Sequence, residues 1–177
     1  MRIITGKYKG RHFDVPRSFK ARPTTDFAKE NIFNVLRGYL DFEECRALDL
    51  FGGTGSISLE LLSRGCTRVV TVEKDRQHFR FILDCAKKLN DENWLPLCGD
   101  VLTFAPRCKE AFDLVFADPP YDLPQLAQLP EIVLNNGNIL AEDGLFVLEH
   151  GKNNDFSTHP RFVEHRQYGS VNFSIFK

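Results

Sequence analysis

The segment DLVFADPPYD, residues 113 to 122, places an acid, two prolines and a tyrosine directly after an apolar stretch that is typical of a buried strand. The carboxylate of Asp118 and a backbone carbonyl after it can accept both N–H hydrogens of an exocyclic amine, which draws the nitrogen toward tetrahedral geometry for methylation. Pro119 and Pro120 would fix the loop and add no competing N–H donors. Tyr121 offers a face for stacking an unpaired base. We predict that these four residues form a catalytic segment.

Acidic residues also stand at the ends of three other predicted strands. Asp49 lies in the apolar strand ALDLF, Glu73 ends RVVTVE, and Asp100 ends LPLCGD. Parallel sheets bind ligands at the carboxyl ends of their strands, near the point where the strand order reverses. We therefore expect these three acids and Asp118 to line one site.

A glycine-rich turn, FGGTG at residues 51 to 55, follows the first of these strands. Its glycines let the backbone approach a ligand closely, and the free N–H groups of the next helix favour negative charge. The nicotinamide or flavin fingerprint GxGxxG lacks its third glycine here. A cofactor with amine and carboxylate groups better explains Asp49, although a tight connection without a ligand is an alternative interpretation of the turn.

Glu73 lies 18 residues beyond Gly55, close to the roughly 20-residue spacing at which a carboxylate binds ribose hydroxyls. This spacing suits any adenosine cofactor and does not separate S-adenosylmethionine from NAD. Asp100 and Val101 are candidates to face an adenine. Asp100 is an equally good candidate for the N-cap of a helix.

The alternation of strands and helices after residue 46 predicts an α/β fold whose parallel sheet is covered on both faces. A C-terminal hairpin would add antiparallel strands at one edge. A first helix carries Ala28, Ile32, Val35 or Leu36, and Tyr39 on one face, with Thr25 or Asp26 as its cap. The remaining predicted helices span 56–64, 75–89 and 125–135, and the predicted strands span 47–51, 68–73, 95–100, 112–118, 145–150, 161–166 and 170–176.

The N-terminal region is basic. Residues 1 to 38 hold nine Lys or Arg against three Asp or Glu, a net +6, which leaves −7 over the rest because the total is −1. Residues 1 to 16 resemble short strands broken by Gly6 and Gly10. We predict that residues 1–25 form a basic hairpin-like extension suited to binding a polyanion, and that 26–177 form the main domain. A merely solvated basic surface is the alternative.

Size and composition exclude several classes of protein. The 177 residues suit one domain with a small extension, and 42% hydrophobic with 27% charged residues is ordinary for a globular protein. No apolar run is long enough to cross a membrane, and the first residues lack a signal-peptide core. Five scattered cysteines without CxxC spacing indicate reduced thiols in a cytoplasmic protein and no zinc site.

Together these motifs resemble class I S-adenosylmethionine-dependent methyltransferases with the (D/N)PP(Y/F) motif, which modify exocyclic amino groups. The chain is most similar to the RsmD family, bacterial methyltransferases that act on the N2 of a guanine in small-subunit (16S) ribosomal RNA. FGGTG replaces the family's usual FAGSG, and Tyr121 stands where phenylalanine is frequent. Residues after His150 match weakly. The matching stretches are MRIITGKYKGR, RPTTDFAKENIFNVL, LDLFGGTGSISLELLSRG, VEKD and FDLVFADPPY.

The resemblance implies a Rossmann-like, seven-stranded, mostly parallel sheet with a C-terminal antiparallel hairpin and a small N-terminal β-hairpin extension. Asp118 to Tyr121 would hold the target amine in a monomeric enzyme that needs no metal. Its RNA would be free or part of an assembling 30S particle. S-adenosylmethionine would be bound by Asp49, Phe51, Gly53, Gly55, Glu73, Lys74, Asp100 and Val101. RNA would contact Lys7, Lys9, Arg11, Arg22, Pro23, Thr24 and Thr25.

Three other functions stay open from the residues alone. A DNA adenine-N6 methyltransferase shares the chemistry of DPPY, but it usually carries a target-recognition segment for which this chain has little room. A protein-glutamine methyltransferase would typically carry Asn in place of Asp118. An RNA-binding assembly factor with an inert methyltransferase fold would bind RNA without binding the cofactor.

Overall fold

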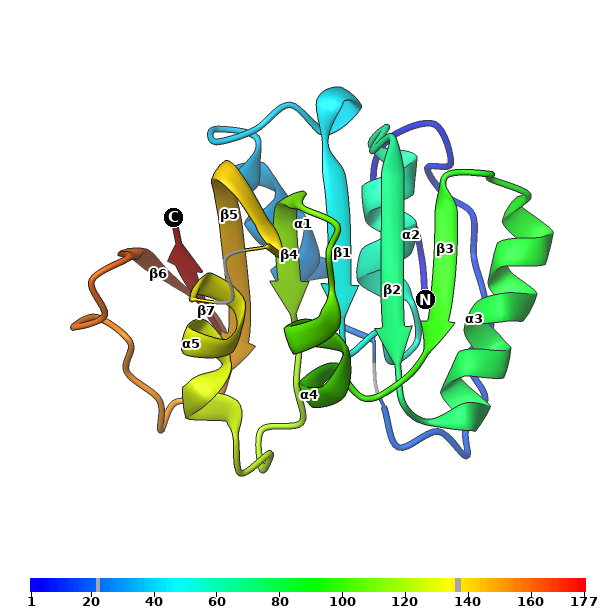
Figure 1. Cartoon of the computed structure of the whole chain (residues 1–177). Coiled ribbons are helices and arrows are strands. Elements are labelled where there is room, and N and C mark those ends of the chain that lie inside the picture. The colour runs from blue at the N-terminus through cyan, green and yellow to red at the C-terminus, as the bar shows by residue number, and fades with distance from the viewer. Residues whose placement is uncertain (22, 136–137) are drawn as a thin grey trace.

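The computed structural model describes residues 1–21, 23–135 and 138–177. Within these ranges seven strands form one sheet in the order β3-β2-β1-β4-β5-β7-β6 (Figure 1). The strands β1 to β5 are parallel, whereas β7 runs antiparallel to both β5 and β6. Their bounds are β1 Arg46–Leu50, β2 Arg68–Glu73, β3 Trp94–Cys98, β4 Phe112–Ala117, β5 Leu140–His150, β6 Phe162–Tyr168 and β7 Val171–Phe176.

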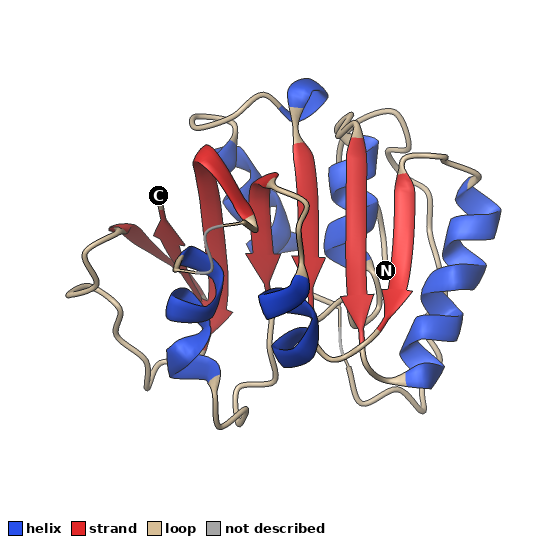
Figure 2. Ribbon diagram, in the orientation of Figure 1, coloured by secondary structure: helices blue, strands red, loops and turns tan. Residues whose placement is uncertain are grey.

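Helices cover both faces of the sheet, as the alternation of elements predicts (Figure 2). Side chains of α1, α2 and α3 share one buried cluster with one face of the sheet, and the short helices α4 and α5 pack on the other. The helices are α1 Asp26–Leu36, α2 Ser56–Ser63, α3 Arg76–Leu89, α4 Val101–Phe104 and α5 Leu129–Leu134, with 3-10 turns η1 Phe42–Glu44, η2 Ala105–Arg107 and η3 Leu126–Gln128.

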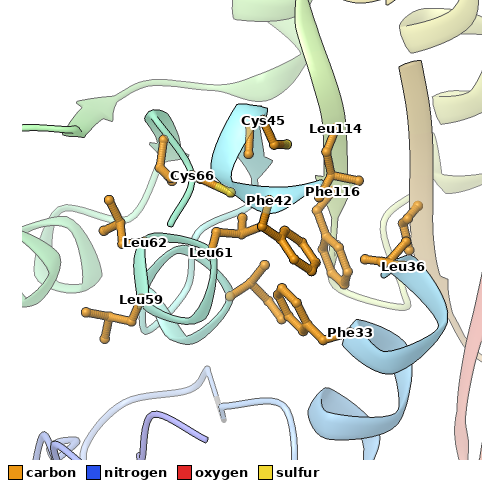
Figure 3. Packing of buried hydrophobic residues seen from close by; sticks show 14 of the residues in the cluster. Phe33, Leu36, Phe42, Cys45, Leu59, Leu61, Leu62, Cys66, Leu114 and Phe116 are labelled. Carbon is orange, nitrogen blue, oxygen red and sulfur yellow. The ribbon is translucent and has the colours of Figure 1, made fainter. Parts of the chain in front are cut away.

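Aromatic side chains fill the centre of the first face. Figure 3 shows Phe33 and Leu36 of α1, Phe42 of η1 and Phe116 of β4 meeting beside the leucines of α2. The ring centroids of Phe33 and Phe42 lie 5.6 Å apart. Burying side chains of this size supplies the main driving force for docking α1 and α2 on the sheet.

The order of the strands reverses next to β1. The chain proceeds outward from β1 to β2 and β3, then returns to place β4 on the other side of β1. This is a topological switch point, and the arrowheads of β1 to β5 in Figure 1 all point to the same edge of the sheet. We call this edge the carboxyl edge.

The prediction of seven strands and of the C-terminal hairpin is confirmed, but several boundaries are wrong. Strand β5 begins at Leu140, five residues before the predicted start, and its pairing with β4 is irregular after Phe112. The helix predicted over 125–135 begins as a 3-10 turn before α5. Tyr39 lies beyond the end of α1 and is exposed, so it does not belong to the buried face of that helix.

The N-terminal extension is a hairpin whose described residues form one isolated antiparallel bridge, between Arg2 and His12, and no regular strands. Backbone hydrogen bonds such as that from the Ile3 N–H to the Arg11 carbonyl, at 3.0 Å, also join its two arms. It is anchored to the domain through buried charges. The carboxylate of Glu60 in α2 accepts the backbone N–H groups of Ile4 and Thr5 at 2.9 and 3.0 Å. The buried Lys29 ammonium donates to the carbonyl of Arg2 at 2.7 Å, and burial lowers the pKa of this lysine.

All five cysteines lie in the described residues and are free thiols. In this part of the chain, no helix has the length and apolar character needed to cross a membrane. The described residues also include no group of three or more His, Cys, Asp or Glu side chains that could hold a metal ion.

Candidate active site

Asp49, in β1, is buried beneath the carboxyl edge. Its Oδ2 accepts a hydrogen bond from the Ser58 hydroxyl at 2.5 Å, and that hydroxyl is also 2.5 Å from the Thr71 hydroxyl. Burial raises the pKa of Asp49 to about 7, and the negative charge of Glu73 acts in the same direction. A cation that arrived beside Asp49 would favour its charged form.

The turn after β1 bends sharply because three of its residues adopt left-handed backbone angles. The φ values of Phe51, Gly53 and Gly55 are 64°, 57° and 79°. A Cβ on Gly52 would meet Thr71 Cγ2 at 2.4 Å, so this position accepts no side chain without a shift of the strand. Unfavourable backbone angles of non-glycine residues, such as that of Phe51, concentrate at ligand sites, and this one points to function in the turn.

Glu73 organises this turn from the end of β2. Its Oε2 accepts the backbone N–H of Gly53 at 2.6 Å, and its Oε1 accepts that of Asp75 at 2.6 Å. Asp75 in turn caps α3 by accepting from two N–H groups of its first turn. Both oxygens of Glu73 thus bind the backbone, and the predicted contact with ribose would use their remaining lone pairs.

Asp100 follows β3 and is the N-cap of α4, because its Oδ1 accepts the N–H of Leu102 at 2.9 Å. Its Oδ2 lies 2.7 Å from the Lys74 ammonium, and the hydrogen bond from this lysine lowers the pKa of Asp100. Val101 is buried next to it. The helix-cap interpretation is therefore confirmed, while contact of Asp100 or Val101 with an adenine stays a prediction.

Asp118 directly follows β4 and lies at the centre of the carboxyl edge. Its backbone N–H is 3.4 Å from the carbonyl of Leu50 in β1, so the two strands are still in contact at this point. Burial raises the pKa of Asp118 well above its usual range, and the charges of Glu149 and Asp49 add to this effect. A carboxyl group in this setting readily accepts a proton.

The rest of the DPPY segment forms one wall beside Asp118. Pro119 is buried, whereas Pro120 is exposed. The hydroxyl of Tyr121 donates to Glu149 Oε1 at 2.8 Å, and the ring lies against Gly151, where an added Cβ would come within 3.3 Å of it. The Tyr121 side chain is 48% exposed, which leaves a free aromatic surface at this edge.

Glu149, in β5, is a site residue that the sequence reasoning missed. It is 5% exposed, and its Oε2 is buried without a hydrogen-bond partner among the described residues. Burial raises the pKa of Glu149 to about 7. The signal was available, since Glu149 stands near the end of the predicted strand 145–150, as the other acids do in theirs.

The register of the sheet brings these acids together. One row of cross-strand partners contains Thr71, Asp49, Phe116 and Val147. Because side chains alternate between faces, the residues two positions further along their strands point to the same face. Those residues are Glu73, Asp118 and Glu149, so all the strand-end acids except Asp100 share one face of the sheet.

The residues predicted to face RNA do not lie together. Lys7 pairs with Asp91 at 2.9 Å before β3, and Arg11 donates to the carbonyl of Lys88 at the end of α3. Both therefore lie at the opposite edge of the sheet, where Lys9 is also exposed.

Residues 23–25 lie at the carboxyl edge. The Thr25 hydroxyl caps α1 by accepting the N–H of Ala28 at 3.2 Å, and one turn later Lys29 reaches the Ser56 hydroxyl at the start of α2. Pro23 and Thr24 are half-buried beside this cap. Arg22 lies outside the described residues.

This sheet order, with its site at the switch point, defines a class I methyltransferase fold. A methyltransferase of Podospora anserina, solved with bound SAH, matches it with a TM-score of 0.69 over 87% of this chain and 80% of that one. At 15% identity this likeness shows the fold alone.

The family is shown by the sequence as a whole. A family model described as "Conserved hypothetical protein 95" matches residues 1–177. Ribosomal RNA small subunit methyltransferase D of Escherichia coli K12 is 31% identical over 90% of this chain and 79% of its own length. A hypothetical protein of Thermus thermophilus is 32% identical, with a TM-score of 0.86 over 100% of this chain and 99% of that one. The chain belongs to this family, the RsmD family of methyltransferases.

Proposed function

We propose that this protein transfers a methyl group from S-adenosylmethionine to the exocyclic N2 of a guanine in small-subunit ribosomal RNA. The observation that carries the proposal is the placement of Glu73, Asp49 and Asp118 on one face of adjacent strands at the carboxyl edge. An acid that begins a rigid Asp-Pro-Pro-Tyr segment then stands beside acids suited to a cofactor. Membership of the family supports the choice of ribosomal RNA.

The residues present fit S-adenosylmethionine. The glycine turn leaves room, since a Cβ on Gly53 would meet nothing closer than 3.8 Å among the described residues. Asp49 has a raised pKa because it is buried, so a cationic ammonium or sulfonium nearby would restore its charge. Glu73 and Asp100 supply acceptors for hydroxyl and amine hydrogens. When bound, this cofactor supplies a methyl group on a positively charged sulfur.

The chain's own groups would act mainly on the target nitrogen. The Asp118 carboxylate and the carbonyl after it would accept the two N–H hydrogens and aim the lone pair at the methyl carbon. The carbon–nitrogen bond would form as the carbon–sulfur bond breaks, with the electron pair left on sulfur. The nitrogen then loses one proton to Asp118. The exposed ring of Tyr121 would stack on the base.

RNA would approach the carboxyl edge along residues 23–25 and meet phosphate-binding groups further away. Lys9, with Lys7 and Arg11 near it, would contact phosphates at the opposite edge, so the bound RNA would have to cross the molecule. This arrangement keeps residues 1–25 as an RNA-facing extension of the domain 26–177. A monomer in the cytoplasm, acting on free RNA or an assembling 30S particle, completes the proposal.

The test is methyl incorporation into purified small-subunit RNA, 30S particles and duplex DNA, followed by mass mapping of the modified nucleotide. We expect N2-methylguanine in RNA or particles and none in DNA. Methylated adenine in DNA would replace the proposal with the DNA alternative. Tight RNA binding without affinity for S-adenosylhomocysteine would indicate an inert assembly factor.

The role of the extension has a separate test in the salt dependence of RNA binding. Lys9→Ala should reduce the slope of log affinity against log salt by about 0.7 to 1 if Lys9 contacts a phosphate. An unchanged slope would remove Lys9 from the RNA surface without affecting the proposed chemistry.

A further inference from the structure

The burial of Glu149 at this edge is not explained by helix capping, by packing or by cofactor binding. Its side chain is buried at the carboxyl edge, and no N–H or O–H donor among the described residues reaches its Oε2, while the Asp118 carboxyl group lies in contact with this side chain. A buried carboxylate oxygen left in this way costs free energy unless the group is protonated or has a task. Its other oxygen accepts a hydrogen bond from the Tyr121 hydroxyl, at 2.8 Å.

The neighbour of Glu149 across the sheet is Asp118. Ala117 of β4 pairs with Leu148 of β5, so the next residue of each strand lies side by side on the same face. The two carboxyl groups interact directly, and Glu149 is buried while Asp118 is half-buried. Two close carboxyl groups in such surroundings do not both ionise easily, so they share one proton near neutral pH.

The charged surroundings of this pair contain few compensating groups. Among the described residues, the titratable groups that act on Glu149 are Tyr121 and Asp118, and Asp49 of β1 adds its charge to Asp118. From the other side, β7 places the apolar Phe173 opposite Glu149. In the described part of the chain, no Lys, Arg or His side chain forms an ion pair with either carboxyl group.

We propose that Glu149 is a positioning residue for methyl transfer: it holds a proton jointly with Asp118 and so sets the pH at which Asp118 can take the proton of the methylated amine. This inference rests on the proposed function. In the resting pair, two carboxyl groups hold one proton. After the carbon–nitrogen bond forms, the amine proton passes to the pair, which then holds two protons and later releases one to water.

Tyr121 adjusts the same equilibrium. Its hydroxyl donates to Glu149 and thereby favours the charged form of that carboxyl group. Tyrosine at this position thus has a task that phenylalanine could not perform, in addition to presenting its ring to a base. Removing the hydroxyl and removing the second carboxyl group of the pair should therefore shift the pH dependence in the same direction.

The experiment measures kcat against pH at saturating RNA and S-adenosylmethionine for the wild type, Glu149→Gln, Tyr121→Phe and Glu142→Gln. Glu142 is an exposed residue of the same strand at its other end, so Glu142→Gln is the matched control. The wild-type rate should rise with pH through an inflection near 7. Glu149→Gln and Tyr121→Phe should each move the inflection higher, because each removes a donor that stabilises the single negative charge of the pair, and Glu142→Gln should leave it in place.

A Glu149→Gln enzyme with the wild-type inflection, whatever its kcat, would overturn the inference while leaving the proposed function intact. A second measurement needs no activity: the melting temperature of the cofactor-free protein from pH 5 to pH 8. Losing one of two competing carboxyl groups should make Glu149→Gln less sensitive to rising pH than the wild type. Parallel curves would also overturn the shared proton, even if the wild type methylated no RNA.

Discussion

The acids on the two sides of the switch point differ in the hydrogen-bond donors that surround them. On the β2–β3 side, Glu73 binds two backbone N–H groups and Asp100 binds one N–H and the Lys74 ammonium. On the β4–β5 side, Asp118 and Glu149 face each other, and one buried oxygen of Glu149 has no partner among the described residues. The first pair is held in place by the protein, while the second pair retains capacity to accept protons.

This contrast shows how one sheet edge can both bind a cofactor and accept protons. Carboxylates with fixed donors keep their charge and their orientation, which suits the recognition of hydroxyl and amine groups of a cofactor. Carboxyl groups that are buried against each other have raised pKa values and can gain or lose a proton near neutral pH. Asp49 lies between the two sets, because it is bound by Ser58 and yet has a pKa raised to about 7.

The largest expected effect is the loss of methyl transfer in Asp118→Ala, on the β4–β5 side of the switch point. Methyl transfer should fall by about 10²–10⁴-fold, because the target amine loses its acceptor. Affinity for S-adenosylhomocysteine, measured by calorimetry, should stay within a few-fold of the wild type. A variant that retained nearly normal methyl transfer and a normal fold would contradict the assignment of cofactor binding to one set of acids and proton acceptance to the other.

The second effect concerns the cofactor side. Glu73→Gln replaces one acceptor oxygen by an NH2 group that faces a backbone N–H, and a hydrogen bond to a charged group is worth about 1.5–3 kcal/mol. Affinity for S-adenosylhomocysteine should therefore fall about 10- to 100-fold, while kcat at saturating cofactor changes less. A large loss of kcat with unchanged affinity would contradict the assignment of Glu73 to binding.

The third effect is on stability and concerns Asp49. The folded state raises the pKa of Asp49 to about 7, so its favourable contribution is complete below the unfolded value of about 4 and is lost as the pH rises through 7. Asp49→Asn should therefore melt a few °C above the wild type at pH 8 and show a smaller difference at pH 5, without cofactor. A difference that did not change with pH would argue against a buried, partly protonated Asp49.

The smallest effect is expected for Lys74→Ala. Its side chain is 76% exposed, and exposed ion pairs contribute only about 0.2–1 kcal/mol. Affinity for S-adenosylhomocysteine should change less than about fivefold, and added salt should reduce the difference between variant and wild type. A loss as large as that of Glu73→Gln would mean that Lys74 contacts the cofactor directly.

Much of the fold was predictable because its signals are local. Strand β2 was predicted with its observed bounds, and the C-cap and N-cap residues that bound α3 follow simple rules of helix termini. The early start of β5 was not predictable, since its first residues, Leu140 to Gly144, include two exposed acids and a glycine that lack a strand pattern. Their pairing depends on β4 beside them.

The sequence allowed us to predict those site residues that stand at the end of an individual strand. Asp49, Glu73 and Asp118 could be placed on one edge because parallel strands share their direction. The pairing of Asp118 with Glu149 depends on the register between β4 and β5, which no local pattern records. The separation of Lys7 and Arg11 from the carboxyl edge likewise depends on where the extension docks.

Trp94 is the sole tryptophan of the chain, and it lies next to the glycine turn. Its Nε1 donates to Thr71 at 2.8 Å, and a Cβ on Gly55 would come within 3.5 Å of its ring. The indole is therefore an intrinsic fluorescent probe of this turn. Its emission should change when a ligand settles on the turn, so binding can be followed in the unlabelled protein by ordinary fluorescence titration.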